Sequence, residues 1–101
     1  MNEVDFRNWL MKNGHTAKVA GDYISRLKRI ERELNYCDID EHYNRDKCTY
    51  LFEVFMNNGK NDEMKKFPNS SLPIGKYYMS TYRLVIKKYI SFRDDITLKN
   101  E

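Results

Sequence analysis

The stretch Ile74–Phe92, IGKYYMSTYRLVIKKYISF, constrains the fold more than any other part of the chain. Its residues have the spacing of a helix with two unlike faces. The apolar face consists of Tyr78, Tyr82, Val85, Ile86 and Tyr89. A second line, on another side of the helix, consists of Lys76, Ser80, Arg83 and Lys87. Such a helix can hold a small core together and present positive charge to an anionic partner.

The length of 101 residues suits one domain with a single hydrophobic core. Two Pro and four Gly leave few forced breaks, which favours long helices over many short strands. We therefore expect an all-α fold, a compact bundle of four to five helices over residues 1–93. Residues 94–101 are polar, and we expect a frayed tail or a linker there.

The first two helices have clear boundary signals. Asn2 is placed to cap a helix over Glu3–Asn13, in which Phe6 and Leu10 form the buried face and Trp9 beside them is either core or an interface anchor. Gly14 ends this helix as a left-handed cap, and Thr16 caps a second helix from about Ala17 to Leu34. The apolar stripe of the second helix consists of Ala20, Tyr23, Ile24, Leu27, Ile30 and Leu34. The two helices and the short turn between them predict an αα-hairpin.

Two features of the second helix lie off its apolar stripe. Lys18, Ser25, Arg29 and Arg32 form a basic line opposite the stripe. Gly21, in the helix interior, costs about 1 kcal/mol relative to Ala. It indicates either close packing of a neighbouring helix or a tolerated defect.

The middle of the chain is harder to divide. Tyr36–Tyr43 is polar and acidic, and we expect a connector there. A third, largely apolar helix is expected from about Asn44 to Asn57–Gly59, and a short fourth one from Asn61 or Asp62 to Lys66. Phe67–Pro73 has the composition of a loop, after which Pro73 or Ile74 begins the last long helix.

Three motifs resemble a known family. Phe6-x-x-Trp9-Leu10, Gly14-His15-Thr16-Ala17-Lys18 and Tyr23-x-x-x-Leu27-x-x-Ile30 resemble the opening of the SAM-like core-binding domain of tyrosine recombinases (phage integrases). The segment Met79–Phe92 resembles the closing helix of such domains, and also helical N-terminal modules of restriction-type nucleases. The resemblance implies a helical module that lies against duplex DNA, and it implies no catalysis because the recombinase catalytic residues belong to a separate domain. The acidic segment Asp38–Asp46 departs from the family pattern.

The basic lines are the candidate DNA-binding site. Lys and Arg side chains neutralise phosphates, and hydroxyls add hydrogen bonds. The predicted contacts are Lys18, Ser25, Arg29, Arg32, Lys76, Ser80, Arg83 and Lys87. The other interpretation of each line is a solvated face of mixed charge. The net charge of +3 is only mildly basic, so the arrangement of the charges carries the argument.

A second hypothesis assigns the chain to another class, a small protein-interaction module or phage-type inhibitor that binds a host protein. The contact would then be formed by the acidic connector together with Tyr77, Leu84 and Lys88, which lie off both faces of the last helix. A partner of a third kind is a catalytic domain in a longer chain.

The remaining reactive residues do not form a site that we can identify. Cys37 and Cys48 are eleven residues apart and are expected to be reduced thiols, and the two His give no zinc-ligand spacing. The acidic segment lacks the pattern of a calcium-binding loop. We therefore expect no metal, no cofactor and no enzymatic activity. No apolar run reaches the roughly 20 residues of a membrane span, so we expect no membrane association and a cytoplasmic location.

Overall fold

The computed structural model describes residues 1–34, 36–55 and 76–99, with the backbone alone for 76–78 and 99. The described residues form five helices and no strand: α1 (Glu3–Lys12), α2 (Ala17–Glu33), α3 (Ile39–Asp46), α4 (Thr49–Val54) and α6 (Lys76–Lys99). The predicted all-α bundle is confirmed. None of these helices has the length and apolar character needed to cross a membrane.

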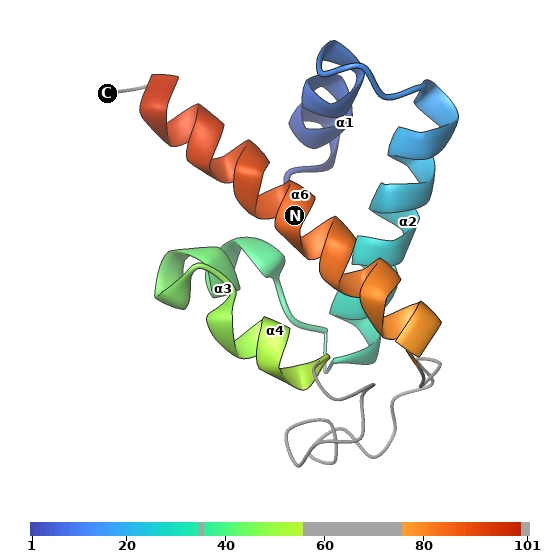
Figure 1. The fold of residues 1–101 in the computed structure, drawn as a ribbon. Coiled ribbons are helices and arrows are strands. Elements are labelled where there is room, and N and C mark those ends of the chain that lie inside the picture. The colour runs from blue at the N-terminus through green and yellow to red at the C-terminus, as the bar shows by residue number, and fades with distance from the viewer. Residues whose placement is uncertain (35, 56–75, 100–101) are drawn as a thin grey trace.

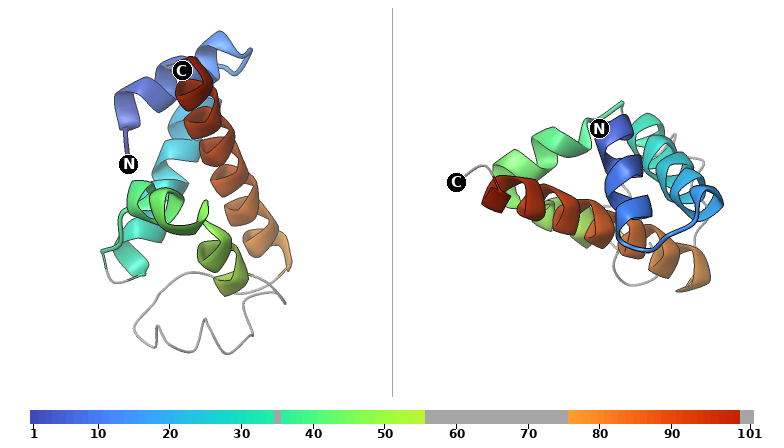
Figure 2. Two further views of the ribbon diagram at one scale, coloured as in Figure 1. Left: turned by 90° about the vertical axis from the view of Figure 1, so that its left-hand side faces the viewer. Right: turned by 90° about the horizontal axis from the view of Figure 1, so that it is seen from above.

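The long helix α6 lies diagonally across the other four (Figure 1). Helix α1 packs against α2, and both pack against α6. Helices α3 and α4 pack against each other and lie together on the other side of the diagonal (Figure 1). The view from above shows α1 between α2 and the α3–α4 pair, with α6 crossing in front of them (Figure 2).

The core receives side chains from all five helices. The four buried residues Tyr82, Val85, Ile86 and Tyr89 confirm the predicted apolar face of the last helix, while the side chain of Tyr78 is outside the described residues. The buried set is Phe6, Leu10, Ala20, Ile24, Leu27, Ile30, Leu34, Ile39, Cys48, Leu51, Val54, Phe55, Met79, Tyr82, Val85, Ile86, Tyr89 and Phe92.

The turn between α1 and α2 forms as predicted. Gly14 has φ +96°, a left-handed conformation that glycine adopts at no steric cost. The hydroxyl of Thr16 accepts a hydrogen bond from the backbone N–H of Val19, which caps α2. Asn2 precedes α1, but its side chain donates to Asp5 and does not cap the helix.

The prediction of one helix from Asn44 onward is wrong. Two short helices, α3 and α4, meet at Lys47 and Cys48, whose φ values are +54° and +66°. The carboxylate of Asp38 caps α3 by accepting from the N–H of Asp40. The carboxylate of Asp46 accepts from the N–H groups of Thr49 and Tyr50 and starts α4. These acidic residues, which we assigned to a connector and to a helix interior, therefore act as caps. The predicted helix at 61–66 and the loop at 67–73 lie outside the described residues.

The expected frayed segment from residue 94 is helical up to Lys99. Asp94 accepts a hydrogen bond from the Tyr43 hydroxyl, and Asp95 accepts one from the Trp9 indole at 2.8 Å. These contacts attach the end of α6 to α3 and α1. They explain why a polar sequence remains ordered there.

Candidate nucleic-acid interface

The outward side of α2 carries the first predicted basic line. Ala20, Ile24 and Leu27 are buried, while Lys18, Ser25 and Arg32 are exposed on the opposite side of the helix. These three residues follow one another at intervals of seven, two helical turns, so their side chains are stacked along the helix. At 1.5 Å per residue the line from Lys18 to Arg32 is about 21 Å long.

The other residues on or beside this line are partly engaged. Arg29 is half-buried and has an electrostatic or hydrogen-bonding neighbour. Arg32 forms an ion pair with the adjacent Glu33 at 3.4 Å, and both groups are in contact with solvent. Exposed Asp22 brings one negative charge close to the line. The Arg32 side chain is 59% exposed but that of Glu33 only 15%, so a phosphate that binds Arg32 competes with a largely buried carboxylate.

The residues of the second predicted line, on α6, differ in their environments. Ser80 and Lys87 are exposed, and the side chain of Lys76 is outside the described residues. The guanidinium of Arg83 donates to the backbone carbonyl of Phe55, at the end of α4, and to the Ser80 hydroxyl at 3.3 Å. Ser80 and Arg83 are therefore brought together, but Arg83 is directed toward α4 and helps to end that helix.

The residues of the protein-interaction hypothesis have different environments. Leu84 is 43% exposed in the middle of α6, whereas Lys88 is half-buried. The Tyr77 side chain is outside the described residues. Other large exposed apolar side chains, Val4, Met11, Tyr36 and Leu98, occur on α1, after α2 and near the end of α6.

A group of carboxylates surrounds the N-terminal ammonium of Met1. The ammonium nitrogen lies 3.2 Å from Glu31 Oε2, 2.9 Å from Asp38 Oδ1 and 3.5 Å from Asp40 Oδ2. Burial alone would lower the pKa of this amine. The hydrogen bond to Asp38 and the charge of Glu31 outweigh burial and raise the pKa to about 10. The hydrogen bond from the ammonium lowers the pKa of Asp38 in turn.

The same group extends to α6 through Asp40. Oδ1 of Asp40 accepts hydrogen bonds from the Tyr89 hydroxyl and from the Arg93 guanidinium, each at 2.6 Å. The Tyr89 oxygen also accepts from the backbone N–H of Asn2 at 2.8 Å. Burial is the main cause of the raised pKa of Tyr89. The members of this network come from four separate segments of the chain, so no local sequence pattern indicates it.

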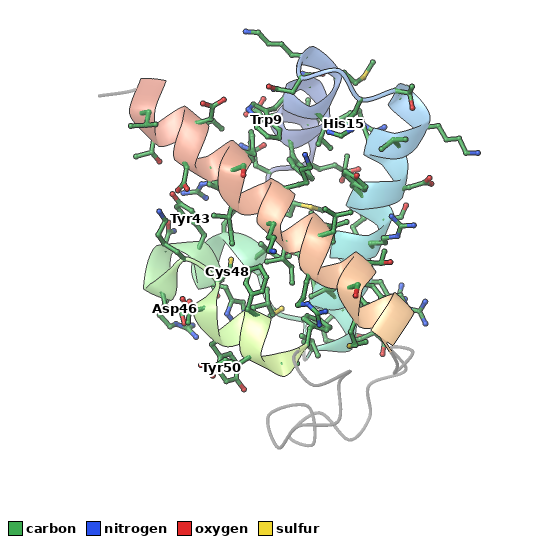
Figure 3. The ribbon with its side chains drawn as sticks, in the orientation of Figure 1. Trp9, His15, Tyr43, Asp46, Cys48 and Tyr50 are labelled. Carbon is green, nitrogen blue, oxygen red and sulfur yellow. The ribbon has the colours of Figure 1, made fainter. Side chains whose placement is uncertain are left out.

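The cysteines and histidines have environments typical of structural residues. Both thiols are free, and burial raises the pKa of Cys37 to about 11 and that of Cys48 to about 12. These thiols are protonated at neutral pH and are weak nucleophiles. Cys48 lies inside the molecule, whereas Tyr50 lies at the outer edge of α4 (Figure 3). Among the described residues, no three His, Cys, Asp or Glu side chains gather closely enough to hold a metal ion.

His42 stacks on Tyr50 at 6.3 Å between ring centroids. Burial and the charge of Arg45 lower its pKa. Its Nδ1 atom is buried without a hydrogen-bond partner among the described residues. His15 packs edge-on against Tyr23, far along the chain from His42. The two histidines thus occupy separate aromatic contacts and do not form a pair.

No protein-family model matches this chain, and neither a curated protein nor a solved structure is significantly similar to it.

Proposed function

We propose that this domain is a non-catalytic DNA-binding module that contacts the phosphates of duplex DNA, as its resemblance to recombinase core-binding domains implies. The observation that carries the proposal is the exposed line of Lys18, Ser25 and Arg32 on the outward side of α2. Two cations and a hydroxyl at two-turn intervals suit a row of phosphate oxygens. Arg29 lies beside them on the same helix.

The distribution of acidic groups also supports this proposal. Glu31 belongs to α2 but lies on its inner side, where it accepts from the Met1 ammonium and from the N–H of Ile39. Asp38 and Asp40 face the same ammonium. Because internal donors hold these carboxylates, their charge is largely compensated, and Asp22 and Glu33 are the acidic residues that remain close to the basic line.

In this proposal, α6 contributes less to phosphate binding than α2 does. Ser80 and Lys87 are exposed on α6, and we keep them as proposed phosphate contacts. Arg83 has five N–H donors, so its bonds to Phe55 and Ser80 leave donors for a phosphate. We keep Lys76 as a predicted contact on the sequence pattern alone. The set of proposed contacts remains Lys18, Ser25, Arg29, Arg32, Lys76, Ser80, Arg83 and Lys87.

A salt titration of binding to a fluorescent blunt duplex tests the proposal. Each phosphate contact adds about 0.9 to the slope of log affinity against log salt. The double variant Lys18→Glu, Arg32→Glu should bind at least ~10-fold more weakly and with a shallower slope. The matched control is Lys12→Glu, Arg45→Glu, which makes the same change in net charge at two exposed positions on α1 and α3.

Equal weakening by both double variants would mean that net charge, and not the α2 surface, determines binding. Affinity that is independent of salt would contradict phosphate contacts altogether.

The protein-interaction hypothesis is supported by the exposed Leu84 in the middle of α6. An apolar side chain at the centre of a long helix suits a hydrophobic contact with another protein. Leu84→Gln, which adds no charge, should leave DNA binding unchanged in the leading proposal. The alternative gains support if the wild-type chain binds no duplex and Leu84→Gln weakens binding to a protein partner.

A further inference from the structure

Tyr36 follows the C-terminal end of α2 and has an unusual combination of properties. Its side chain is 85% exposed, the highest exposure among the large apolar residues described. Its φ is +54°, in the left-handed region that bulky residues rarely adopt. Glycine or asparagine suits such a position better, so packing and backbone geometry do not explain a tyrosine here.

Leu34 and Cys37, before and after Tyr36 in the chain, both make backbone hydrogen bonds to α2. The N–H of Leu34 donates to the carbonyl of Ile30 at 3.0 Å, and the N–H of Cys37 donates to the carbonyl of Glu31 at 2.9 Å. Ile30 and Leu34 are buried. The exposed ring of Tyr36 thus lies beside Cys37, whose backbone N–H is hydrogen-bonded to α2.

The ring lies close to the basic line along the chain. Tyr36 is four positions after Arg32, so their Cα atoms are at most about 14 Å apart. A row of cations that leads to an exposed aromatic ring is the combination by which proteins hold a strand with an unpaired base. The cations bind phosphates, and the ring stacks on the base.

We propose that Tyr36 stacks on an unpaired base next to the duplex whose phosphates lie along α2, so that the preferred ligand is duplex DNA with a short single-stranded overhang. This inference rests on the proposed function. A base inside a duplex has both faces covered by its neighbours and offers no surface for the ring. Tyr36 follows the Arg32 end of the line in the chain, so we place the unpaired base at the corresponding end of the duplex.

The experiment compares three DNA ligands of equal duplex length: a blunt duplex, one with a three-nucleotide overhang, and one with the same overhang without bases. The abasic overhang has the same phosphates, so the difference between the last two isolates stacking. We expect the overhang with bases to bind roughly fivefold to a hundredfold more tightly than the abasic one. A 2-aminopurine in the overhang should lose fluorescence when it stacks on the ring.

Two variants connect the effect to the ring. Tyr36→Asn removes the ring, suits the left-handed backbone and should abolish both the preference and the fluorescence change. Tyr36→Phe keeps the ring and should retain both. Equal binding to the two overhangs by the wild-type chain, or a preference that survives in Tyr36→Asn, would overturn the inference.

The outcomes separate this inference from the proposed function. Binding of the blunt duplex that depends on Lys18 and Arg32, without a preference for bases in the overhang, would leave the proposed function standing and remove only the role of Tyr36. Failure to bind any of the three ligands would overturn both.

Discussion

The hydroxyl of Tyr89 donates a hydrogen bond of 2.6 Å to Oδ1 of Asp40 and thereby joins the middle of α6 to the first turn of α3. The same hydroxyl oxygen accepts from the N–H of Asn2, just before α1. One oxygen atom thus connects three segments that are distant in sequence. Its surroundings are buried, so its hydrogen bonds contribute more than those of an exposed tyrosine.

Tyr89→Phe should lower the free energy of unfolding by about 1–2 kcal/mol, because it leaves the N–H of Asn2 without this acceptor and removes one donor from Asp40. Urea denaturation measures the change. The control is Tyr36→Phe, which removes a hydroxyl from an exposed ring and should change stability by less than about 0.5 kcal/mol. Similar losses in both variants would contradict a special role for the Tyr89 hydroxyl.

Stability should decrease at alkaline pH through the Met1 ammonium. Its folded-state pKa is raised to about 10 from a reference value of 8.0. A raised pKa means that the charged amine stabilises the fold fully below pH 8.0, and that this contribution is lost as pH rises through about 10. Urea midpoints between pH 7 and about 10.5 test this, with a chain acetylated at Met1 as the control. An identical alkaline decrease in the acetylated chain would assign the effect to other groups.

Stability should also decrease at acidic pH through Asp38 and Asp94. The ammonium of Met1 lowers the pKa of Asp38, and the Tyr43 hydroxyl lowers that of Asp94. A lowered pKa means that the contribution is present above the reference value of 3.8 and is lost as pH falls through the folded-state value. Asp38→Asn should reduce the acid dependence, as followed by circular dichroism between pH 6 and about 2. An unchanged acid profile in this variant would exclude Asp38 as a contributor.

Gly21→Ala should stabilise the domain by about 0.5–1 kcal/mol, because alanine favours the helix and reduces the entropy of the unfolded chain. A Cβ atom at this position would lie 3.8 Å from the side chain of Arg7, an ordinary van der Waals distance. Of our two interpretations of this glycine, the structure thus favours the tolerated defect. Thermal unfolding measures the gain. Gly14→Ala is the opposing control and should destabilise, because its φ is +96°.

Asp95→Ala should lower the free energy of unfolding by about 1–2 kcal/mol, because it leaves the Trp9 indole N–H without its acceptor. The lost hydrogen bond joins α1 to the C-terminal part of α6. Trp9 is the only tryptophan, so its fluorescence reports directly on this contact. Its emission should shift in the variant. Asp22→Ala, at an exposed position on α2, is the control and should leave the spectrum unchanged.

The helices with local signals could be predicted from the sequence. Gly14 and Thr16 fix the turn before α2 through backbone geometry and a side-chain cap that depend on only a few neighbouring residues. The apolar spacing of α2 and α6 identified most of the core for the same reason. The exposure of the basic line on α2 could be predicted from the same spacing, because the line lies opposite the buried stripe.

The division between α3 and α4 could not be predicted in this way. Lys47 and Cys48 adopt positive φ without the Gly or Asn that usually marks such a turn. The network around Asp40 depends on Met1, Tyr89 and Arg93, whose proximity only the folded chain establishes. Likewise, no local pattern predicts that Arg83 turns toward the carbonyl of Phe55. These features arise from tertiary contacts, which local patterns do not encode.

The contacts between the first and the last helix have a consequence for biosynthesis. Trp9 and Asp95 are 86 positions apart, and Asn2 and Tyr89 are 87 apart. A nascent chain can pack α1 against α2 early, but the contacts of Trp9 and Asn2 with α6 form only after α6 has emerged from the ribosome. The complete bundle therefore depends on contacts of high sequence separation, which are slow to form.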